Sequence, residues 1–202
     1  MIHFLLRFRQ ALFSPIQKIQ LYMQPKMIKG EHALLDLVDV LKEKHLTHYM
    51  IVTTPGFIKR GTLQSFFDAL NQNDIQYSIF HDVKPDPEIS DVEKLKEMYI
   101  KDGCQALIAI GGGSVIDCSK AALACVQMKK LDVTTVLHTG RVSKPLPLLI
   151  AVPTTAGTGS EVTAGAVITD PIKKRKYALS HLFLIPKYAV LESSLLDSLP
   201  SN

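Results

Sequence analysis

The sequence contains few cysteines, and their spacing matches neither a disulfide framework nor a redox motif. Only three occur among the 202 residues, Cys104, Cys118 and Cys125. They form no C-x-x-C pair, and their odd number argues against a closed set of disulfides. We therefore expect a protein of a reducing compartment, the cytoplasm.

The chain also lacks any concentration of charge. Its 23 basic residues give a net charge of only +4, and they are dispersed rather than gathered in a run interleaved with aromatic residues. This distribution does not favour nucleic acid as a partner. The sequence has no internal repeat, and its hydrophobic fraction of 47% predicts a globular chain with a substantial core.

The first 24 residues lack an apolar run long enough to span a bilayer, and they lack the cleavage pattern of a signal peptide. Apolar residues such as Phe4 alternate there with basic ones such as Arg7 and Lys18, so we interpret residues 1–24 as an amphipathic extension. A basic segment of this kind also fits a membrane surface. We prefer packing against the remaining domain, residues 25–202, or against a second subunit.

Helical and strand-like segments alternate along the rest of the chain. This order predicts an α/β fold, a mostly parallel sheet flanked by helices, whose ligands collect at the carboxyl ends of the strands. We expect helices at residues 32–43, 61–72, 91–103 and 115–128, strands at 48–53, 76–81, 106–110 and 147–152, and a hairpin with arms 167–171 and 173–179.

A glycine turn follows the apolar run 106–110, in the segment Gly111-Gly-Gly-Ser-Val-Ile-Asp-Cys-Ser-Lys120. Residues without a Cβ let the backbone approach a pyrophosphate, and the start of the following helix favours its negative charge. Ser114 adds a hydroxyl donor. Asp117 is open to two interpretations: it accepts from ribose or nicotinamide groups, or it complements the positive end of the helix.

Three loops are expected to meet at the carboxyl edge of the sheet and to frame one dinucleotide: residues 53–57, 111–114 and 153–160. The third belongs to the segment Pro153-Thr-Thr-Ala-Gly-Thr-Gly-Ser-Glu-Val-Thr163, which is rich in hydroxyl groups and glycine. In the basic run 173–176, the first three residues are typical of a solvated hairpin tip. Lys176, beside an apolar residue, is the better candidate for contact with phosphate.

The glycine turn and the hydroxyl-rich segment resemble the GGGSxxDxAK and PTTAGTGSEVT motifs of the iron-containing (group III) alcohol dehydrogenases. The resemblance runs from Pro25 to Pro200. It implies a Rossmann-like cofactor domain of the dehydroquinate synthase-like kind. It also implies hydride transfer between a primary alcohol or aldehyde and NAD or NADP, with Fe2+ (or Zn2+) as Lewis acid in the full-length enzyme, and a homodimer.

Carried over by motif position, the resemblance assigns cofactor contacts and no catalytic residue or metal ligand. Pyrophosphate and nicotinamide contacts are implied for Gly111, Gly112, Gly113, Ser114 and Asp117. The same cofactor is lined by Thr154, Thr155, Thr158 and Ser160, and Lys176 matches a lysine that approaches the ribose.

Cofactor choice is expected to depend on Thr54. Many relatives that prefer NAD carry an aspartate after the first strand, where a carboxylate repels the 2′-phosphate of NADP. This chain has Thr53-Thr-Pro-Gly56 there. We therefore predict that NADP is tolerated, with Thr54 and Lys59 near the adenosine ribose.

The resemblance places the metal ligands, an aspartate and three histidines, in a helical domain that has no counterpart before Asn202. We therefore expect this chain to supply the cofactor-binding half of such an enzyme and to be inactive alone, since the Lewis acid is missing. One alternative is a non-catalytic NAD(P)-binding module. Another is a relative of the glycerol dehydrogenases, which the hydroxyl-rich motif matches less closely.

Overall fold

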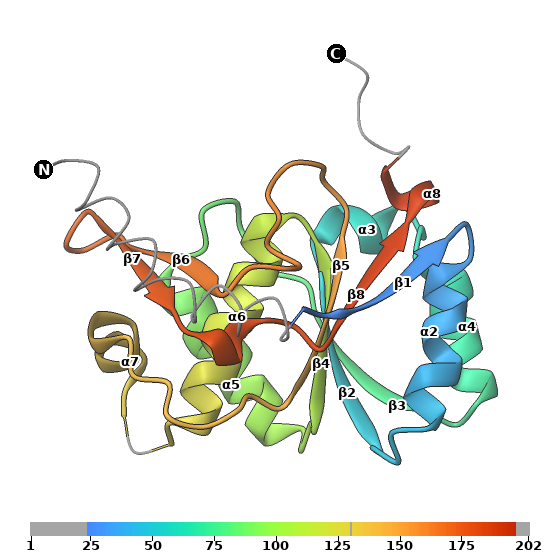
Figure 1. Ribbon diagram of the computed structural model, residues 1–202, viewed down its shortest axis with the longest axis horizontal. Coiled ribbons are helices and arrows are strands. Elements are labelled where there is room, and N and C mark those ends of the chain that lie inside the picture. The colour runs from blue at the N-terminus through green and yellow to red at the C-terminus, as the bar shows by residue number, and fades with distance from the viewer. Residues whose placement is uncertain (1–23, 130, 197–202) are drawn as a thin grey trace, which may run out of the picture.

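The computed structural model describes residues 24–129 and 131–196, and it has the expected α/β architecture (Figure 1). The described residues form a six-stranded sheet in the order β1-β8-β5-β4-β2-β3, and every pairing in it is parallel. Its strands are β1 (Lys26–Gly30), β2 (His48–Val52), β3 (Gln76–Phe80), β4 (Ala106–Gly111), β5 (Leu148–Pro153) and β8 (Tyr188–Glu192).

Helices cover both faces of this sheet, as Figure 1 shows with α2 and α4 on one side and α5 and α6 on the other. They are α2 (Ala33–Lys42), α3 (Pro55–Lys59), α4 (Gln64–Gln72), α5 (Ile89–Lys101), α6 (Gly113–Gln127), α7 (Val133–Thr139) and α8 (Ser193–Leu196), with a 3-10 turn η1 (Leu182–Leu184). The N-terminal extension predicted for residues 1–24 lies outside the described residues, except for Gln24.

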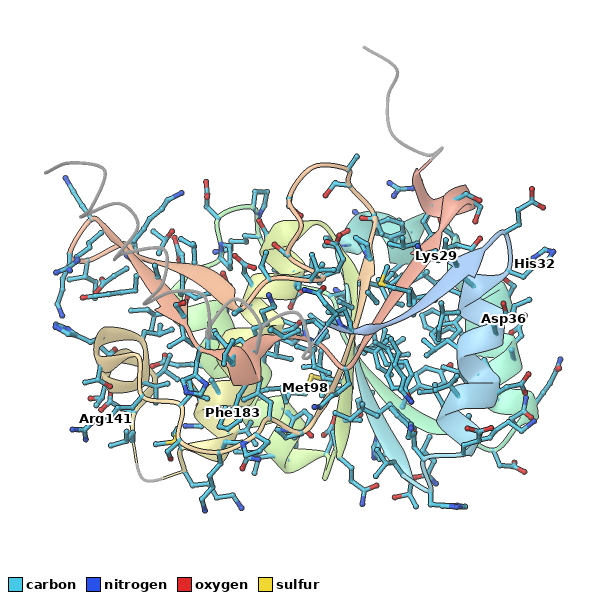
Figure 2. All side chains as sticks on the ribbon, in the orientation of Figure 1. Lys29, His32, Asp36, Met98, Arg141 and Phe183 are labelled. Atoms are coloured by element: carbon cyan, nitrogen blue, oxygen red, sulfur yellow. The ribbon has the colours of Figure 1, made fainter. Side chains whose placement is uncertain are left out.

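Two hydrophobic cores sit on the two faces because alternate residues of a strand point to opposite sides. Met50 and Val52 of β2 pack with α5 and α6, whereas Tyr49 and Ile51 pack with α2 and α4. In Figure 2 Met98 of α5 points into the first core, while Lys29, His32 and Asp36 lie at the outer edge.

The strands that follow β2 and β4 in the chain are added on opposite sides of this central pair. From β2 the chain continues outward to the edge strand β3, and from β4 it continues to β5 on the other side. The helices that follow β2 and β4 pack on opposite faces. Loops that leave two adjacent parallel strands toward opposite faces leave a crevice between them, which is where open α/β sheets bind ligands.

A separate antiparallel hairpin, β6 (Gly165–Asp170) and β7 (Arg175–Ser180), packs against α6. It also contacts α7 through β7, and it is attached to the loop before α5, where the N–H of Thr169 donates to the carbonyl of Pro87 at 2.8 Å. The hairpin therefore follows the hydroxyl-rich loop directly and is held at the same edge of the sheet.

The structure differs from the sequence-based boundaries in several places. The helix predicted from Gly61 begins at Gln64, and the short helix α3 begins at Pro55, inside the loop predicted at 53–57. Proline favours a first helical position because its fixed φ suits a helix. Helix α7 was not predicted, although Asp132 caps it through Thr135 N–H at 2.8 Å.

Strands β1 and β8 were also missed by the sequence reasoning. They pair with each other in parallel, with Lys26 opposite Tyr188 and Gly30 opposite Glu192. β1 is a short edge strand with mostly exposed side chains, so its pattern lacks the apolar alternation that identifies a strand.

Candidate nucleotide-binding site

The glycine turn lies where β4 passes into α6, in the middle of the sheet. Gly112 is the N-cap of α6 in an extended conformation, and none of the residues that the structure describes caps this helix end with a side chain. A Cβ at Gly111 would lie 2.5 Å from Cγ2 of Val115, so only glycine fits there without movement of the helix. The turn thus presents backbone N–H groups and the positive end of a 15-residue helix at the crevice.

The hydroxyl-rich loop between β5 and β6, residues 154–164, closes against this turn, beside the start of α6 (Figure 1). Its first residue is tied down because Thr154 N–H donates to the carbonyl of Gly111 at 3.1 Å. A Cβ at Gly112 would lie 3.1 Å from Oγ1 of Thr155, and one at Gly113 would lie 3.2 Å from Cγ2 of Thr158. The two predicted motifs are therefore in contact.

The loop residues differ in how far they are buried. Thr154 and Ser160 are buried, Thr155 is half-buried and Thr158 is exposed. Ser160 also faces the turn, since a Cβ at Gly113 would lie 3.3 Å from its Oγ. The loop is anchored at both ends and leaves hydroxyl groups toward solvent between them.

Asp117 lies one turn into α6 and is only partly engaged. Its Oδ2 accepts from the N–H of Val167 at 3.0 Å, whereas its Oδ1 is buried with no hydrogen-bond partner among the described residues. Burial raises the pKa of this carboxyl, and the Val167 N–H, the charge of Lys120 and the Ser160 hydroxyl oppose that rise. An unsatisfied buried acceptor is costly and indicates a missing donor.

Lys120 is fully buried, a feature to which the sequence reasoning assigned no role. Its Nζ donates to the carbonyls of Thr163 at 2.7 Å and Gly165 at 2.9 Å. Burial lowers the pKa of Lys120 from 10.5 to about 8, against the opposing charges of Asp117 and Glu161. A sequence signal was present, since this lysine directly precedes the small and apolar run 121–126.

Thr54 lies at the carboxyl end of β2, on the other side of the crevice from the glycine turn. It is the N-cap of α3, but its side chain makes no capping hydrogen bond. The preceding Thr53 is completely buried, and its Oγ1 has no partner among the described residues. Lys59 and Arg60 are exposed at the end of α3, and no carboxylate stands at position 54.

Lys176 lies on β7, opposite Thr169, and is exposed. Its Nζ forms an ion pair with Oδ1 of Asp86 at 2.8 Å. The structure therefore places this ammonium between the hairpin and the loop before α5, and not in contact with the glycine turn. A nucleotide would have to compete with Asp86 for it.

Within residues 24–129 and 131–196, no three metal-ligating side chains come together into a group that could hold an ion. In the same residues, no helix has the length and apolar character to cross a membrane. Cys104, Cys118 and Cys125 are all buried and free.

An open parallel sheet with a glycine turn at the reversal point of its strands defines the class of α/β proteins that bind nucleotides at that edge. Within this class the chain belongs to the iron-containing alcohol dehydrogenase family, whose model matches residues 24–193.

Individual relatives agree with this assignment. Choline dehydrogenase of Bacillus subtilis is 31% identical over 190 residues, which cover 93% of this chain and 47% of the relative. Sulfoacetaldehyde reductase of Bifidobacterium kashiwanohense, solved with NAD+, is 31% identical with a TM-score of 0.78 over 88% of this chain and 47% of that one. An alcohol dehydrogenase from Oenococcus oeni is 30% identical with a TM-score of 0.80 over the same shares. The chain thus spans about half the length of the relatives it matches.

Proposed function

We propose that this chain binds NAD or NADP in the crevice between β2 and β4, as the cofactor-binding half of an alcohol dehydrogenase. The observation that carries the proposal is the contact between the glycine turn and the hydroxyl-rich loop. A Cβ at Gly112 or Gly113 would crowd that loop, so the site keeps open backbone where a pyrophosphate needs close approach.

Each predicted residue has a role in this proposal. The N–H groups of residues 111–113 and the Ser114 hydroxyl hold the pyrophosphate. Oδ1 of Asp117, buried and without a hydrogen-bond partner in the described part of the chain, accepts from an N–H or O–H of the nicotinamide half. Thr154, Thr155, Thr158 and Ser160 line the cofactor, and Lys176 reaches the ribose once Asp86 releases it.

The residues after β2, where the adenosine end of the cofactor would bind, support tolerance of NADP. Thr54 has no negative charge to repel a 2′-phosphate, and its side chain is not used for capping. Exposed Lys59 and Arg60 follow within the same short helix and would attract a phosphate.

The whole enzyme in this proposal transfers hydride between a primary alcohol or aldehyde and the nicotinamide, with Fe2+ (or Zn2+) supplying Lewis-acid polarisation of the substrate oxygen. The described residues do not form a metal centre. We propose that the 202-residue chain alone is inactive. We also propose that the protein is a homodimer and is located in the cytoplasm. The free, buried cysteines agree with a reducing compartment.

A second candidate is a non-catalytic NAD(P)-binding module, which the absence of a metal-ligand group among the described residues favours. Titration of the purified chain with NADH and with NADPH in a calorimeter tests binding itself. Saturable binding of both supports the proposal, strong exclusion of NADPH contradicts the argument from Thr54, and no binding of either contradicts the site.

The intact mass of the native polypeptide, its metal content and its NAD(P)H-dependent aldehyde reduction separate the two candidates. A mass near 22.4 kDa without metal or turnover favours the binding module. A larger polypeptide with bound iron or zinc and activity favours the dehydrogenase.

A further inference from the structure

Strand β6 has one edge that β7 does not pair. The N–H of His181 donates to the carbonyl of Ala164 at 2.9 Å, which puts the backbone groups of the even-numbered residues of β6 on the side of β7. In an antiparallel pair the alternate residues then point their backbone groups the other way. The backbone N–H and C=O groups of residues 163, 165, 167 and 169 therefore point away from β7.

Groups from outside the hairpin bind one backbone group of each of those residues. Lys120 Nζ donates to the carbonyls of Thr163 and Gly165, at 2.7 and 2.9 Å. Asp117 Oδ2 accepts from the N–H of Val167 at 3.0 Å. The N–H of Thr169 donates a hydrogen bond to the carbonyl of Pro87.

Lys120 and Asp117 of α6 thus supply the hydrogen bonds that a neighbouring strand would supply. They lie about one helical turn apart, so the ammonium reaches two carbonyls and the carboxylate reaches an N–H along the same edge of β6. The glycine turn stands at the start of the same helix. The hydroxyl-rich loop is consequently tied to the β4–α6 unit at both ends, by Thr154 N–H to Gly111 and by Lys120 to Thr163.

We propose that Lys120 is a positioning residue, whose ammonium fixes the end of the hydroxyl-rich loop to α6 and so holds Thr158 and Ser160 over the glycine turn. Its consequence for cofactor affinity rests on the proposed function, whereas its hold on the loop does not.

An ammonium suits this position for a chemical reason. Lysine has three donors and no acceptor, and here they meet two carbonyls and, at 3.4 Å, the hydroxyl of Thr163. Bonds with a charged donor are roughly twice as strong as neutral ones. The negative charges that act on the ammonium, Asp117 and Glu161, come from α6 and from the loop itself.

The test uses the full chain with Lys120→Met, which keeps an unbranched apolar stem and removes the donors. Ser119→Ala is the matched control, because Ser119 is equally buried on the same helix but donates to its own helix at Val115. Amide hydrogen exchange reports the loop without cofactor, and NADH fluorescence reports affinity.

We expect exchange across residues 161–168 to rise about tenfold or more in Lys120→Met, since two charged hydrogen bonds are lost, while β4 and β5 stay protected. The dissociation constant of NADH should rise about tenfold as the loop loosens. Ser119→Ala should leave both values unchanged. Unaltered exchange in residues 161–168 of Lys120→Met would overturn the proposal, whatever happens to binding.

A second variant separates positioning from general packing and serves if Lys120→Met does not fold. Lys120→Ala leaves space for a small amine, so propylammonium should restore the protection of residues 161–168, and tetramethylammonium should not. Equal effects of the two cations would contradict a role for the ammonium as donor. If the wild-type chain fails to bind NADH, the proposed function fails, and hydrogen exchange still decides the role of Lys120.

Discussion

The buried ammonium of Lys120 makes the stability of this chain rise with pH, in the same direction as a salt-bridged carboxylate but in the alkaline range. Its pKa falls from 10.5 in the unfolded chain to about 8 in the folded one, because burial disfavours the charged form. Between these values the unfolded chain binds more protons. The free energy of unfolding therefore rises with pH across that window. This contribution of Lys120 is lost as pH falls through 8.

The magnitude follows from the two pKa values. Linkage between them gives a rise of about 2–3 kcal/mol in the free energy of unfolding from about pH 7 to pH 10. The cysteines also contribute in this range, because they titrate there in the unfolded chain while burial raises their pKa values in the folded one. Their contribution is removed by comparing the wild type with Lys120→Met, in which only this ammonium is missing.

The assay is urea unfolding followed by far-ultraviolet circular dichroism at several pH values, with both proteins in the same buffers. We expect the difference, wild type minus Lys120→Met, to rise by the stated amount toward pH 10. Ser119→Ala, which removes no ionisable group from the same helix, should give a flat difference. A flat or falling difference for Lys120→Met would refute the reasoning, since it would mean that the ammonium is not desolvated.

Three further predictions concern the cofactor site and a helix end. Gly113→Ala should weaken NADH binding about tenfold in calorimetry, because the new Cβ would lie 3.2 Å from Thr158 and displace the loop. Unchanged affinity would contradict cofactor binding between the glycine turn and the hydroxyl-rich loop. Thr54→Asp should weaken NADPH binding about tenfold more than NADH binding, through repulsion of the 2′-phosphate, and equal losses would count against that position. Asp91→Ala should lower the free energy of unfolding by about 1–2 kcal/mol in urea, because buried Asp91 accepts from Glu88 N–H in the capping box of α5; a neutral result would contradict this cap.

The sequence was sufficient to predict the glycine turn and its place in the fold. An apolar run, three glycines and a helix-forming segment are consecutive, so local conformation decides them. The contact of residues 111–114 with the hydroxyl-rich loop was also predictable. Carboxyl ends of adjacent parallel strands meet at one edge, and β4 and β5 are adjacent.

The protein partners of the charged side chains were not predictable in this way. Lys176 stays a predicted phosphate contact, and in the structure it pairs with Asp86, 90 residues earlier in the chain. Asp117 stays a predicted cofactor contact, and one of its oxygens accepts from Val167, 50 residues later. Lys120 received no role, and its partners are 43 and 45 residues away.

The amino-acid sequence by itself determined the alternation of helices and strands from α2 to α6 and the backbone open to a nucleotide, because glycine, proline and apolar periodicity act on neighbouring residues. Only the tertiary structure decided which charges are buried and what they bind. Burial and partnership depend on segments brought together by folding: Lys101 at the end of α5 is exposed, whereas Lys120 of α6 is buried and donates to two carbonyls.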